Sequence, residues 1–505
     1  MLPRESSRAA EPHDAPHEGS TGPGSVGLGA FSVVTYRGRM TSMAPRDATM
    51  FWLSRRTAND MFLLYCFAET GSTTAELRAF VAARAATIPD LRIRLREIPG
   101  NLGYPRWERA EFTPQQFVVH RPDDARWPTL LNRVGELLGT GVDATESPWR
   151  IHVFRGVRDV PTAAGPALVV VLQLSHALAD GTRAAAIARS LFAADAEVVH
   201  SLPGMPVDNS ADRPVGPVKT RLRPVDYWGQ ICGLLGVLRL PWQVLTTARR
   251  GRAAYLAQRE LAERTAAGEI PAPTPGFAPT PLNPSAPVGV LAHRVRLLVL
   301  DRSALRVPGH TVTVVALTAV SRAMATYLAE RGEPPARLGA ALPMAVPADG
   351  AARNSYRSLS IDLHVDEPDL VRRAALIADD LATRRTRALN PLLAVQGWVT
   401  EAVPALLTAR DVARAELDAV PAAIDGNTVL SSVYRGPADL ALAGAPVLFT
   451  GGFPALGTVM HLTHGLHGIG ETITLSVHFD AAVLTDPDRY LALLAAALDD
   501  VVAAH

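Results

Sequence analysis

One stretch, residues 167–192, restricts the possible fold more than any other part of the chain. It begins with the apolar run ALVVVLQL, continues through SHALADG, and ends with TRAAAIARSLF, whose apolar residues recur at helical spacing. A short apolar run followed by a glycine-containing turn predicts a buried strand, and the helix after it must pack back onto the sheet. The chain is therefore expected to contain an α/β unit with a polar turn at the end of a buried strand.

A second α/β unit is predicted from about residue 289 onward. The strand HRVRLLVL leads into an apolar helix near residues 314–331, and residues 358–365 and 472–479 alternate apolar with polar side chains. Such alternation predicts strands that are buried on one face only. Two units also suit the length, because 505 residues are too many for one ordinary core.

Composition suggests where the units begin and end. Residues 1–38 are rich in Pro, Gly, Ser and charge, so we expect a disordered tail. Residues 39–205 are expected to form the N-terminal unit and residues 289–505 the C-terminal unit. The segment between them, 206–288, is Pro-rich at both ends and has helical sequence near 226–267, which predicts a long crossover.

The crossover contains an amphipathic segment with two open interpretations. Residues 227–245 place apolar side chains near one helical face, and arginines follow at 249–252. This pattern fits a helix packed on a domain, and it also fits a helix lying in a membrane interface. A membrane span is excluded for this segment, because Arg239 and Pro241 interrupt the apolar run.

The charge and cysteine content argue against several classes of function. Fifty basic and 49 acidic side chains leave a formal net charge of +1, so we do not expect a nucleic-acid partner. Cys66 and Cys232 lie in apolar surroundings without metal-ligand spacing, which predicts buried free thiols in a reducing compartment. The first twenty residues lack the apolar centre of a secretory signal, so we expect a cytoplasmic protein.

The polar turn carries the residues on which a functional interpretation depends. His176 follows the predicted strand, at the edge of a core where water is partly excluded. A neutral imidazole there can accept a proton from a hydroxyl while its other nitrogen makes an orienting hydrogen bond. A structural histidine fits the spacing too, so both roles are open. Asp180 and Gly181 are expected to hold the turn, by capping the helix and by permitting an unusual backbone conformation.

Two other sets of polar residues are given no catalytic role. Ser175 precedes His176, but neighbours on a strand point to opposite faces, and the sequence has no GxSxG motif. His461, His464 and His467 in MHLTHGLHG have a spacing that could suggest a metal cluster. The intervening glycines indicate a loop instead, so we expect a loop there and no metal site.

The turn SHALADG resembles the HHxxxDG motif of the wax ester synthase and acyl-CoA:diacylglycerol acyltransferase family. That family shares the chloramphenicol acetyltransferase fold with the condensation domains of peptide synthetases. Further likenesses follow in order from about residue 41: MAPRDATMFWLS with Asp47, LRIRLREIPGNLGYPRWE, SPWRIHVFRGV, TPLNPSAPVG, RNSYRSLSIDLHV with Asn354, and NTVLSSVYRGP with Ser432. Several dispersed matches in order are more specific than one short motif.

The resemblance implies an α/β protein of two chloramphenicol-acetyltransferase-like subdomains with mixed sheets and an active-site tunnel between them. It implies that acyl-CoA enters from one side, that an alcohol enters from the other, and that His176 deprotonates the hydroxyl for direct attack on the thioester. The expected products are triacylglycerol or wax ester, from diacylglycerol or a long-chain alcohol. Acyl-CoA is the co-substrate and no further cofactor is expected. The amphipathic crossover would bring such an enzyme to the inner membrane or to lipid bodies.

Three departures from the family pattern keep other functions open. Ser175 replaces the first histidine of the motif, Thr313 and Val314 replace an Asn-Asp pair, and Ser432 replaces the asparagine of the late motif. Asn354 keeps its residue type, and its role is open between a structural Asx turn and a substrate contact. The alternatives are an acyltransferase of specialised metabolism acting on a polar alcohol, and a catalytically silent member that binds lipid.

Overall fold

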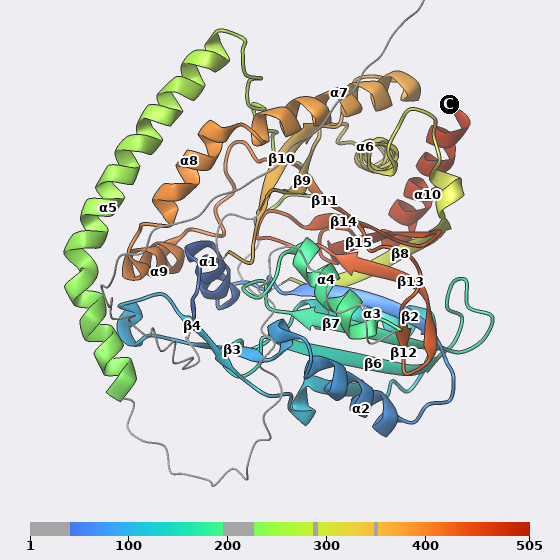
Figure 1. Cartoon of the computed structure of the whole chain (residues 1–505). Helices are drawn as coiled ribbons and strands as arrows, with labels where there is room; N and C mark the ends of the chain where they lie inside the picture. The colour runs from blue at the N-terminus through green and yellow to red at the C-terminus, as the bar shows by residue number, and fades with distance from the viewer. Residues whose placement is uncertain (1–40, 195–226, 286–290, 348–351) are drawn as a thin grey trace, which may run out of the picture. The chain divides into compact units, whose positions relative to one another are not determined.

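The structure is a computed structural model that describes residues 41–194, 227–285, 291–347 and 352–505. Figure 1 shows these residues as ribbons coloured along the chain. The tail predicted for residues 1–38 and the Pro-rich start of the crossover lie outside the described residues.

The predicted apolar strand is β7 (Ala167–Leu174), and all of its residues are buried. It lies between β2 (Met61–Ala68) and β6 (Trp149–Val157) in a six-stranded sheet with the order β12-β13-β2-β7-β6-β5. Strands β2, β7 and β6 are antiparallel, whereas β5 (Phe117–His120) runs parallel to β6. The first sheet is therefore mixed, as predicted. A small sheet beside it contains β1 (Thr41–Ser42), β3 (Ile93–Arg96) and β4 (Arg106–Arg109).

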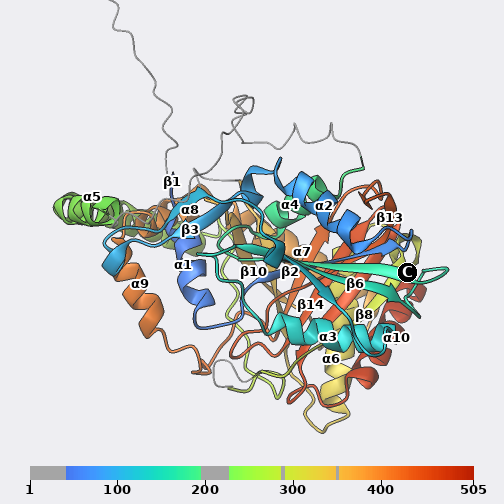
Figure 2. The ribbon, with the colours of Figure 1, turned by 90° about the horizontal axis from the view of Figure 1, so that it is seen from below.

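Both faces of β7 are buried because different elements cover them. Leu168, Val170 and Leu172 belong to the core under α2 (Thr74–Ala85) and α4 (Gly181–Phe192). The intervening residues belong to a core with α3 (Trp127–Leu138) and residues of β8 (His293–Asp301). Figure 2 shows α2 and α4 on one face of the sheet and α3 on the other. A strand covered on both sides reads as a continuous apolar run, which explains its sequence.

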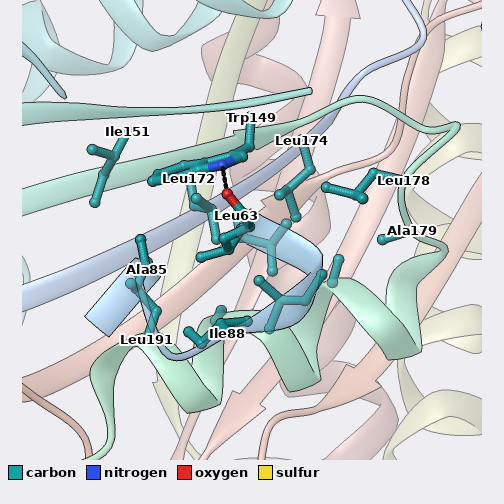
Figure 3. Packing of buried hydrophobic residues seen from close by; sticks show 14 of the residues in the cluster. Leu63, Ala85, Ile88, Trp149, Ile151, Leu172, Leu174, Leu178, Ala179 and Leu191 are labelled. Atoms are coloured by element: carbon teal, nitrogen blue, oxygen red, sulfur yellow. Dashed lines mark hydrogen bonds between the residues drawn. The ribbon is translucent and has the colours of Figure 1, made fainter. Parts of the chain in front are cut away.

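Trp149 anchors the core between the first sheet and its helices. Its indole is buried, and Nε1 donates a hydrogen bond of 3.0 Å to the carbonyl of Leu91. Figure 3 shows Leu63, Leu172 and Leu174 around this ring. Because the only polar atom of the ring has a partner, the large apolar surface is buried without an unsatisfied group.

The second sheet has six strands in the order β10-β9-β11-β14-β15-β8. Its other strands are β9 (Gly339–Ala345), β10 (Tyr356–Asp362), β11 (Thr428–Tyr434), β14 (Leu462–Ile469) and β15 (Thr472–Asp480). Strand β11 runs parallel to β9 and β14, and the other pairs are antiparallel. The C-terminal unit is thus also a mixed sheet.

Helices cover the outer face of the second sheet. They are α6 (Val312–Ala329), α7 (Leu370–Ala388) and α10 (Pro487–Ala503) (Figure 1). Of the helices that the structure describes, α6 is the one that is by itself long and apolar enough to cross a membrane, but 67% of it is buried inside the fold. The apolar side chains of α6 therefore pack against α10 and the second sheet.

The prediction that residues 472–479 form a strand is confirmed, but the prediction of one polar, solvated face is wrong. Ile473, Leu475 and Val477 lie in the core under the helices. The alternate residues Ser476 and His478 are buried too, because that face lies against β13 and the segment following it. Ser476 Oγ donates to the Gly452 carbonyl, and His478 Nδ1 lies 2.8 Å from the Pro454 carbonyl oxygen.

Strands β12 (Ala441–Leu442) and β13 (Ala445–Phe453) connect the two sheets. They come from the C-terminal part of the chain, yet β13 pairs with β2 in antiparallel fashion, with Gly452 opposite Leu63. Strand β13 also contacts β14 and β15 of the second sheet. The two sheets are therefore joined by a strand and not only by the crossover.

The crossover helix is α5 (Tyr227–Ala266), which runs beside α8 (Pro391–Thr400) (Figure 1). Thr247 Oγ1 donates a hydrogen bond of 2.7 Å to the Ala402 carbonyl, and Arg250 Nη1 lies 3.5 Å from a Glu401 carboxylate oxygen. The side chains of residues 227–244 lie outside the described part, so the structure does not test the amphipathic face predicted for them. The second half of α5 packs on α8. Helix α9 (Ala405–Arg414) follows α8 in the chain.

Candidate active site

The turn between β7 and α4 is short and held by its own aspartate. Asp180 is the N-cap of α4, and its Oδ1 accepts a hydrogen bond of 2.9 Å from the Arg183 backbone N–H. Helix α4 starts at Gly181, whose φ is not positive, so the prediction of an unusual backbone conformation at this glycine is wrong. A Cβ there would make only ordinary contacts with Val433 and Met61, at 3.8 and 3.9 Å. Capping satisfies one backbone donor at the helix start, so the chain can reverse direction directly after the buried strand.

A loop from the C-terminal unit fixes the same turn from the other side. Asp180 Oδ2 accepts a bond of 2.9 Å from the Ser355 N–H, and the Asp180 N–H donates to the Arg353 carbonyl at 3.3 Å. Asn354 Nδ2 donates to the His176 carbonyl at 2.8 Å. The turn that carries His176 is thus bound to residues about 175 positions away in the sequence.

The same loop is attached to helix α1 (Pro45–Ser54) through Asp47. Asp47 is fully buried, and it accepts hydrogen bonds from the Arg353 N–H, the Asn354 N–H and Asn354 Nδ2 at 2.9–3.0 Å. Burial raises the pKa of Asp47, and these hydrogen bonds and Arg353 act in the opposite direction. Asn354 therefore bridges a buried carboxyl group and the backbone of His176.

A buried ion group supports the loop and α4 together. Asp90 lies 2.6 Å from Arg353 Nη1 and 2.9 Å from Arg183 Nη2. Burial opposes ionisation of Asp90, but the two guanidinium groups outweigh it and hold its pKa below the usual value. One carboxylate thereby connects an arginine of each unit, close to the turn.

His176 lines a cavity of about 690 Å³ between the two units. The N-terminal unit contributes residues of β2, the turn and α4, and the C-terminal unit contributes residues of β9, β10, β11 and β13. The ring of Tyr356 lies 6.0 Å from the imidazole, centroid to centroid. A smaller cavity of about 250 Å³ shares Asn59 and Asp60 with it, and lies beside it toward the end of α1. The imidazole is thus at the junction of the two units and is reachable from a cavity.

Burial keeps the imidazole of His176 neutral. Its Nδ1 is buried and has no hydrogen-bond partner in the described part of the chain. Burial lowers the pKa of His176 below its usual value, although its own carbonyl, Asn354 and the carboxylates of Asp180 and Asp47 act in the opposite direction. A neutral imidazole at neutral pH can accept a proton, which is the property that a general base needs.

Ser175 and Ser432 occupy different positions. Ser175 is 1% exposed, lines neither cavity, and its Oγ accepts from the Ala177 N–H at 3.4 Å. Ser432 lines the large cavity, and its Oγ lies 2.9 Å from Thr313 Oγ1 at the start of α6. The two hydroxyls that stand where the family pattern has asparagines, at positions 313 and 432, thus form a hydrogen bond with each other.

Comparison of the sequence with known protein families identifies the family of this chain. The sequence profile of the wax ester synthase/diacylglycerol acyltransferase catalytic domain matches residues 43–297, half of the chain. The chain belongs to this family. It is accordingly an acyl-CoA-dependent O-acyltransferase, as the sequence predicted. None of the curated protein sequences compared matches the chain.

Solved structures agree with this wax ester synthase/diacylglycerol acyltransferase fold. The wax ester synthase/diacylglycerol acyltransferase of Marinobacter aquaeolei VT8 is similar with a TM-score of 0.56 and 18% identity, over 91% of this chain and 98% of that one. A starter condensation domain of rhizomide synthetase, solved as a variant in complex with C8-CoA, has a TM-score of 0.51 and 13% identity, over 92% and 95%. The predicted fold class, two sheet-containing bodies with mixed sheets, is confirmed.

The prediction of a loop at His461, His464 and His467 is wrong for this family member. These residues belong to β14 or directly precede it, and all three are buried. His461 Nδ1 lies 3.1 Å from Asp480 Oδ2, whereas His464 Nε2 lies 2.8 Å from Tyr490 Oη. The glycines serve close packing instead of a loop, since a Cβ at Gly465 would lie 2.2 Å from the Gly452 carbonyl oxygen.

Sequence reasoning missed several residues of the site. Arg353, Asp90 and Arg183 were not singled out, although they hold the turn, and Tyr356 was not expected in the cavity. No local signal could have found the ion group, because its members come from three separate segments. Arg353 does adjoin Asn354, so the resemblance at that segment was the one available hint.

Proposed function

We propose that this enzyme transfers a fatty acyl group from CoA to a long-chain alcohol or diacylglycerol, with His176 as the general base. The observation that carries the proposal is the position of His176 on a cavity lined by both units. Because Nδ1 is buried, we assign the proton transfer to Nε2. Asp180, Gly181 and Asn354 position the imidazole, and Ser175 only shapes the turn.

The reaction follows from these positions. His176 Nε2 takes the hydroxyl proton as the alcohol oxygen attacks the thioester carbonyl, giving a tetrahedral oxyanion. Collapse of this intermediate breaks the carbon–sulfur bond, and the imidazolium returns the proton to the CoA thiolate. Tyr356 is a candidate donor to the oxyanion, because burial first, and Asp180 second, raise the pKa of its phenol and keep it protonated. No step needs a metal or a further cofactor.

The lining of the cavity supports a lipid substrate. Apolar residues from β2, β9 and β13 line the cavity that His176 also lines, among them Phe62, Leu63 and Phe453. Each buried methylene contributes about 0.8 kcal/mol to binding, so acyl-chain length should affect affinity strongly. Acyl-CoA binding is further supported by the similar condensation domain, which was solved with C8-CoA.

A defined assay tests the proposal. The purified protein receives radiolabelled palmitoyl-CoA with hexadecanol, with dioleoylglycerol, or with a set of polar alcohols. We expect ester from a lipid alcohol and a loss of at least about 100-fold for His176→Ala. The matched variant is His120→Ala, whose ring lies on β5 and hydrogen-bonds His152 outside the cavity. Ester formation unaffected by His176→Ala would refute the mechanism, and free CoA without ester would indicate a thioesterase.

We also propose that the enzyme is cytoplasmic and acts at the surface of a membrane or lipid body. Large apolar side chains are exposed on the layer of α5, α8 and α9, namely Tyr255, Leu256, Trp398, Leu406 and Leu407. Interfacial binding of such side chains gives the enzyme access to lipid substrates. Flotation with phosphatidylglycerol vesicles tests this, with a Tyr255→Ser, Leu256→Ser double variant expected to float less. Equal flotation of both proteins, or none of either, contradicts it.

A further inference from the structure

Arg435 is a buried cation without a counterion. It directly follows β11, lines the large cavity, and is 4% exposed. Its Nη1 donates to Thr450 Oγ1 at 2.6 Å, and Nε is buried without a partner. Its guanidinium lies 5.0 Å from the centre of the Tyr65 ring. No carboxylate forms an ion pair with it among the residues that the structure describes.

His467 lies beside this guanidinium and is equally unpaired. It is 5% exposed, it lines the same cavity, and its Nδ1 is buried without a hydrogen-bond partner. Burial, and to a lesser degree Arg435, hold the pKa of His467 well below its usual value, so the ring is a neutral donor or acceptor. Two buried polar side chains with free hydrogen-bonding groups thus meet at one wall of the cavity.

Gly452 provides the space in front of both side chains. A Cβ built on this glycine would lie 2.7 Å from His467 Nε2 and 2.9 Å from Arg435 Nη2. Both atoms therefore approach the same point of β13, and Gly452 itself lines the cavity. The glycine leaves room there that any other residue would fill.

An unpaired guanidinium at this depth needs an explanation. Arginine stays protonated in proteins, and a buried charge is normally paired. Stacking on Tyr65 compensates part of the lost hydration, but it leaves the N–H donor on Nε without a partner. A planar guanidinium with free donors is suited to a carboxylate.

The distance from His176 identifies which part of a substrate would reach Arg435. Met61 pairs with Leu174, just before the catalytic turn, and Tyr65 lies four residues farther along β2. Four residues of a strand span about 13 Å. The guanidinium lies over Tyr65, and its Nη2 approaches Gly452, which pairs with Leu63, two residues beyond Met61. Arg435 therefore lies about 7–13 Å along β2 from the catalytic turn, where a substrate group several methylenes away from the reacting bond would reach.

We propose that this acyltransferase uses a substrate whose unreactive end carries a carboxylate, bound by Arg435 and His467 beside Gly452. The inference rests on the proposed acyl transfer and specifies its substrate class. The carboxylate can belong to the acceptor, as in an ω-hydroxy fatty acid, or to the acyl donor, as in the mono-CoA thioester of a dicarboxylic acid.

Two assay arms distinguish these sources. The acceptor arm compares 12-hydroxydodecanoate with 1-dodecanol, and the donor arm compares dodecanedioyl mono-CoA with dodecanoyl-CoA. In one arm we expect kcat/KM to be at least tenfold higher for the carboxylate-bearing compound. Arg435→Met should abolish this preference, and Arg435→Lys should keep part of it. Arg155→Met, which removes an arginine paired with Glu69 outside the cavity, should keep it fully.

Further measurements keep the result interpretable. Gly452→Ala retains the arginine but fills the space before it, and should reduce the preference if Arg435→Met fails to fold. Without any CoA compound, 12-hydroxydodecanoate or dodecanedioate should raise the Tm of the wild type and not of Arg435→Met. This shift is expected even if no ester forms. Failure of the proposed acyl transfer can therefore be distinguished from failure of the proposed carboxylate binding. A wild type without preference in either arm, or a preference that survives Arg435→Met, overturns the inference.

Discussion

Asn354 donates a hydrogen bond of 2.8 Å from its side-chain amide to the main-chain carbonyl of His176, across 178 positions of sequence. The same amide nitrogen also donates to the buried carboxyl group of Asp47 at 3.0 Å. The backbone of the proposed base is thus held by the other unit of the enzyme. Asn354 is a positioning residue, because it contacts the turn and not the reacting atoms.

Replacing Asn354 should reduce turnover more than substrate affinity. Asn354→Ala leaves the His176 carbonyl without its donor, so we expect a loss of about 1–3 kcal/mol in stability. A displaced imidazole should lower kcat by about 10–100-fold with little change in KM. Steady-state kinetics and thermal unfolding measure both effects. Asn390→Ala, which removes the N-cap of the distant helix α8, should destabilise without affecting kcat. Equal kcat in both variants would contradict the positioning role.

The pH profile should report the shifted pKa of His176. The base acts in its neutral form, and burial lowers its pKa below the usual value of 6.5. Activity should therefore increase as pH rises through a midpoint below 6.5, and be complete by neutral pH. The dependence of kcat/KM on pH between 4.5 and 8 tests this, at constant ionic strength. A midpoint at or above 6.5 would show that His176 is not the titrating base.

Ionisation of buried Asp60 should lower the free energy of unfolding as pH rises. Burial raises its pKa from 3.8 to about 6, although it accepts bonds of 2.8 Å from the Val142 N–H and Gln173 Nε2. The folded state then binds the proton more tightly than the unfolded state, so stability is highest below pH 4 for this group and falls toward pH 6. Two pKa units correspond to about 3 kcal/mol.

The variant Asp60→Asn isolates this effect. Its amide oxygen can still accept hydrogen bonds, but it does not titrate. Compared with the wild type, its free energy of unfolding should gain up to about 3 kcal/mol between pH 4 and pH 7, measured by urea denaturation. The two proteins are compared because half-buried His120 and buried His152, with pKa values of about 4, add the opposite pH dependence to both. A constant difference across this range would contradict the prediction.

Asp90→Asn should be strongly destabilising at neutral pH. It leaves the half-buried guanidinium groups of Arg183 and Arg353 without their shared carboxylate, for which we expect about 3–5 kcal/mol. The pKa of Asp90 is lowered, so its contribution exists above pH 4 and disappears as pH falls through the folded-state pKa. Urea denaturation should therefore show a large loss of unfolding free energy for Asp90→Asn at pH 7 and a small loss at pH 3.

A matched variant at an exposed pair provides the comparison. Asp439→Asn removes the partner of Arg189, where the carboxylate is largely exposed, and should change stability by less than about 1 kcal/mol. If Asp90→Asn and Asp439→Asn have equal effects, the buried ion group does not support the turn.

The Thr313–Ser432 hydrogen bond should be visible as energetic coupling. Thr313→Val and Ser432→Ala each remove the same bond of 2.9 Å, so the double variant should lose less than the sum of the single losses. We expect a coupling energy of about 0.5–1 kcal/mol in a double-mutant cycle of unfolding. Additive losses would show that the two hydroxyls act independently.

Local sequence alone determined the elements around the site. The continuous apolar run predicted β7, because a strand buried on both faces is apolar throughout. The helical spacing after Gly181 predicted α4, because a helix buried on one face repeats its apolar residues every three to four positions. The position of His176 at the end of that strand followed directly. The dispersed motifs then identified the family, which the profile match confirms.

Only the tertiary structure decided which partners bury these elements. The alternation at residues 472–479 marked a strand, but it could not show that β13 covers the polar face, nor that Gly465 permits this approach. Asp47, Asn354 and His176 are brought together by hydrogen bonds between residues 178 and 307 positions apart. Nothing in the sequence distinguishes Arg435 from a surface arginine. Periodicity reports how much of a face is buried, whereas the identity of what lies against it depends on the arrangement of the whole chain.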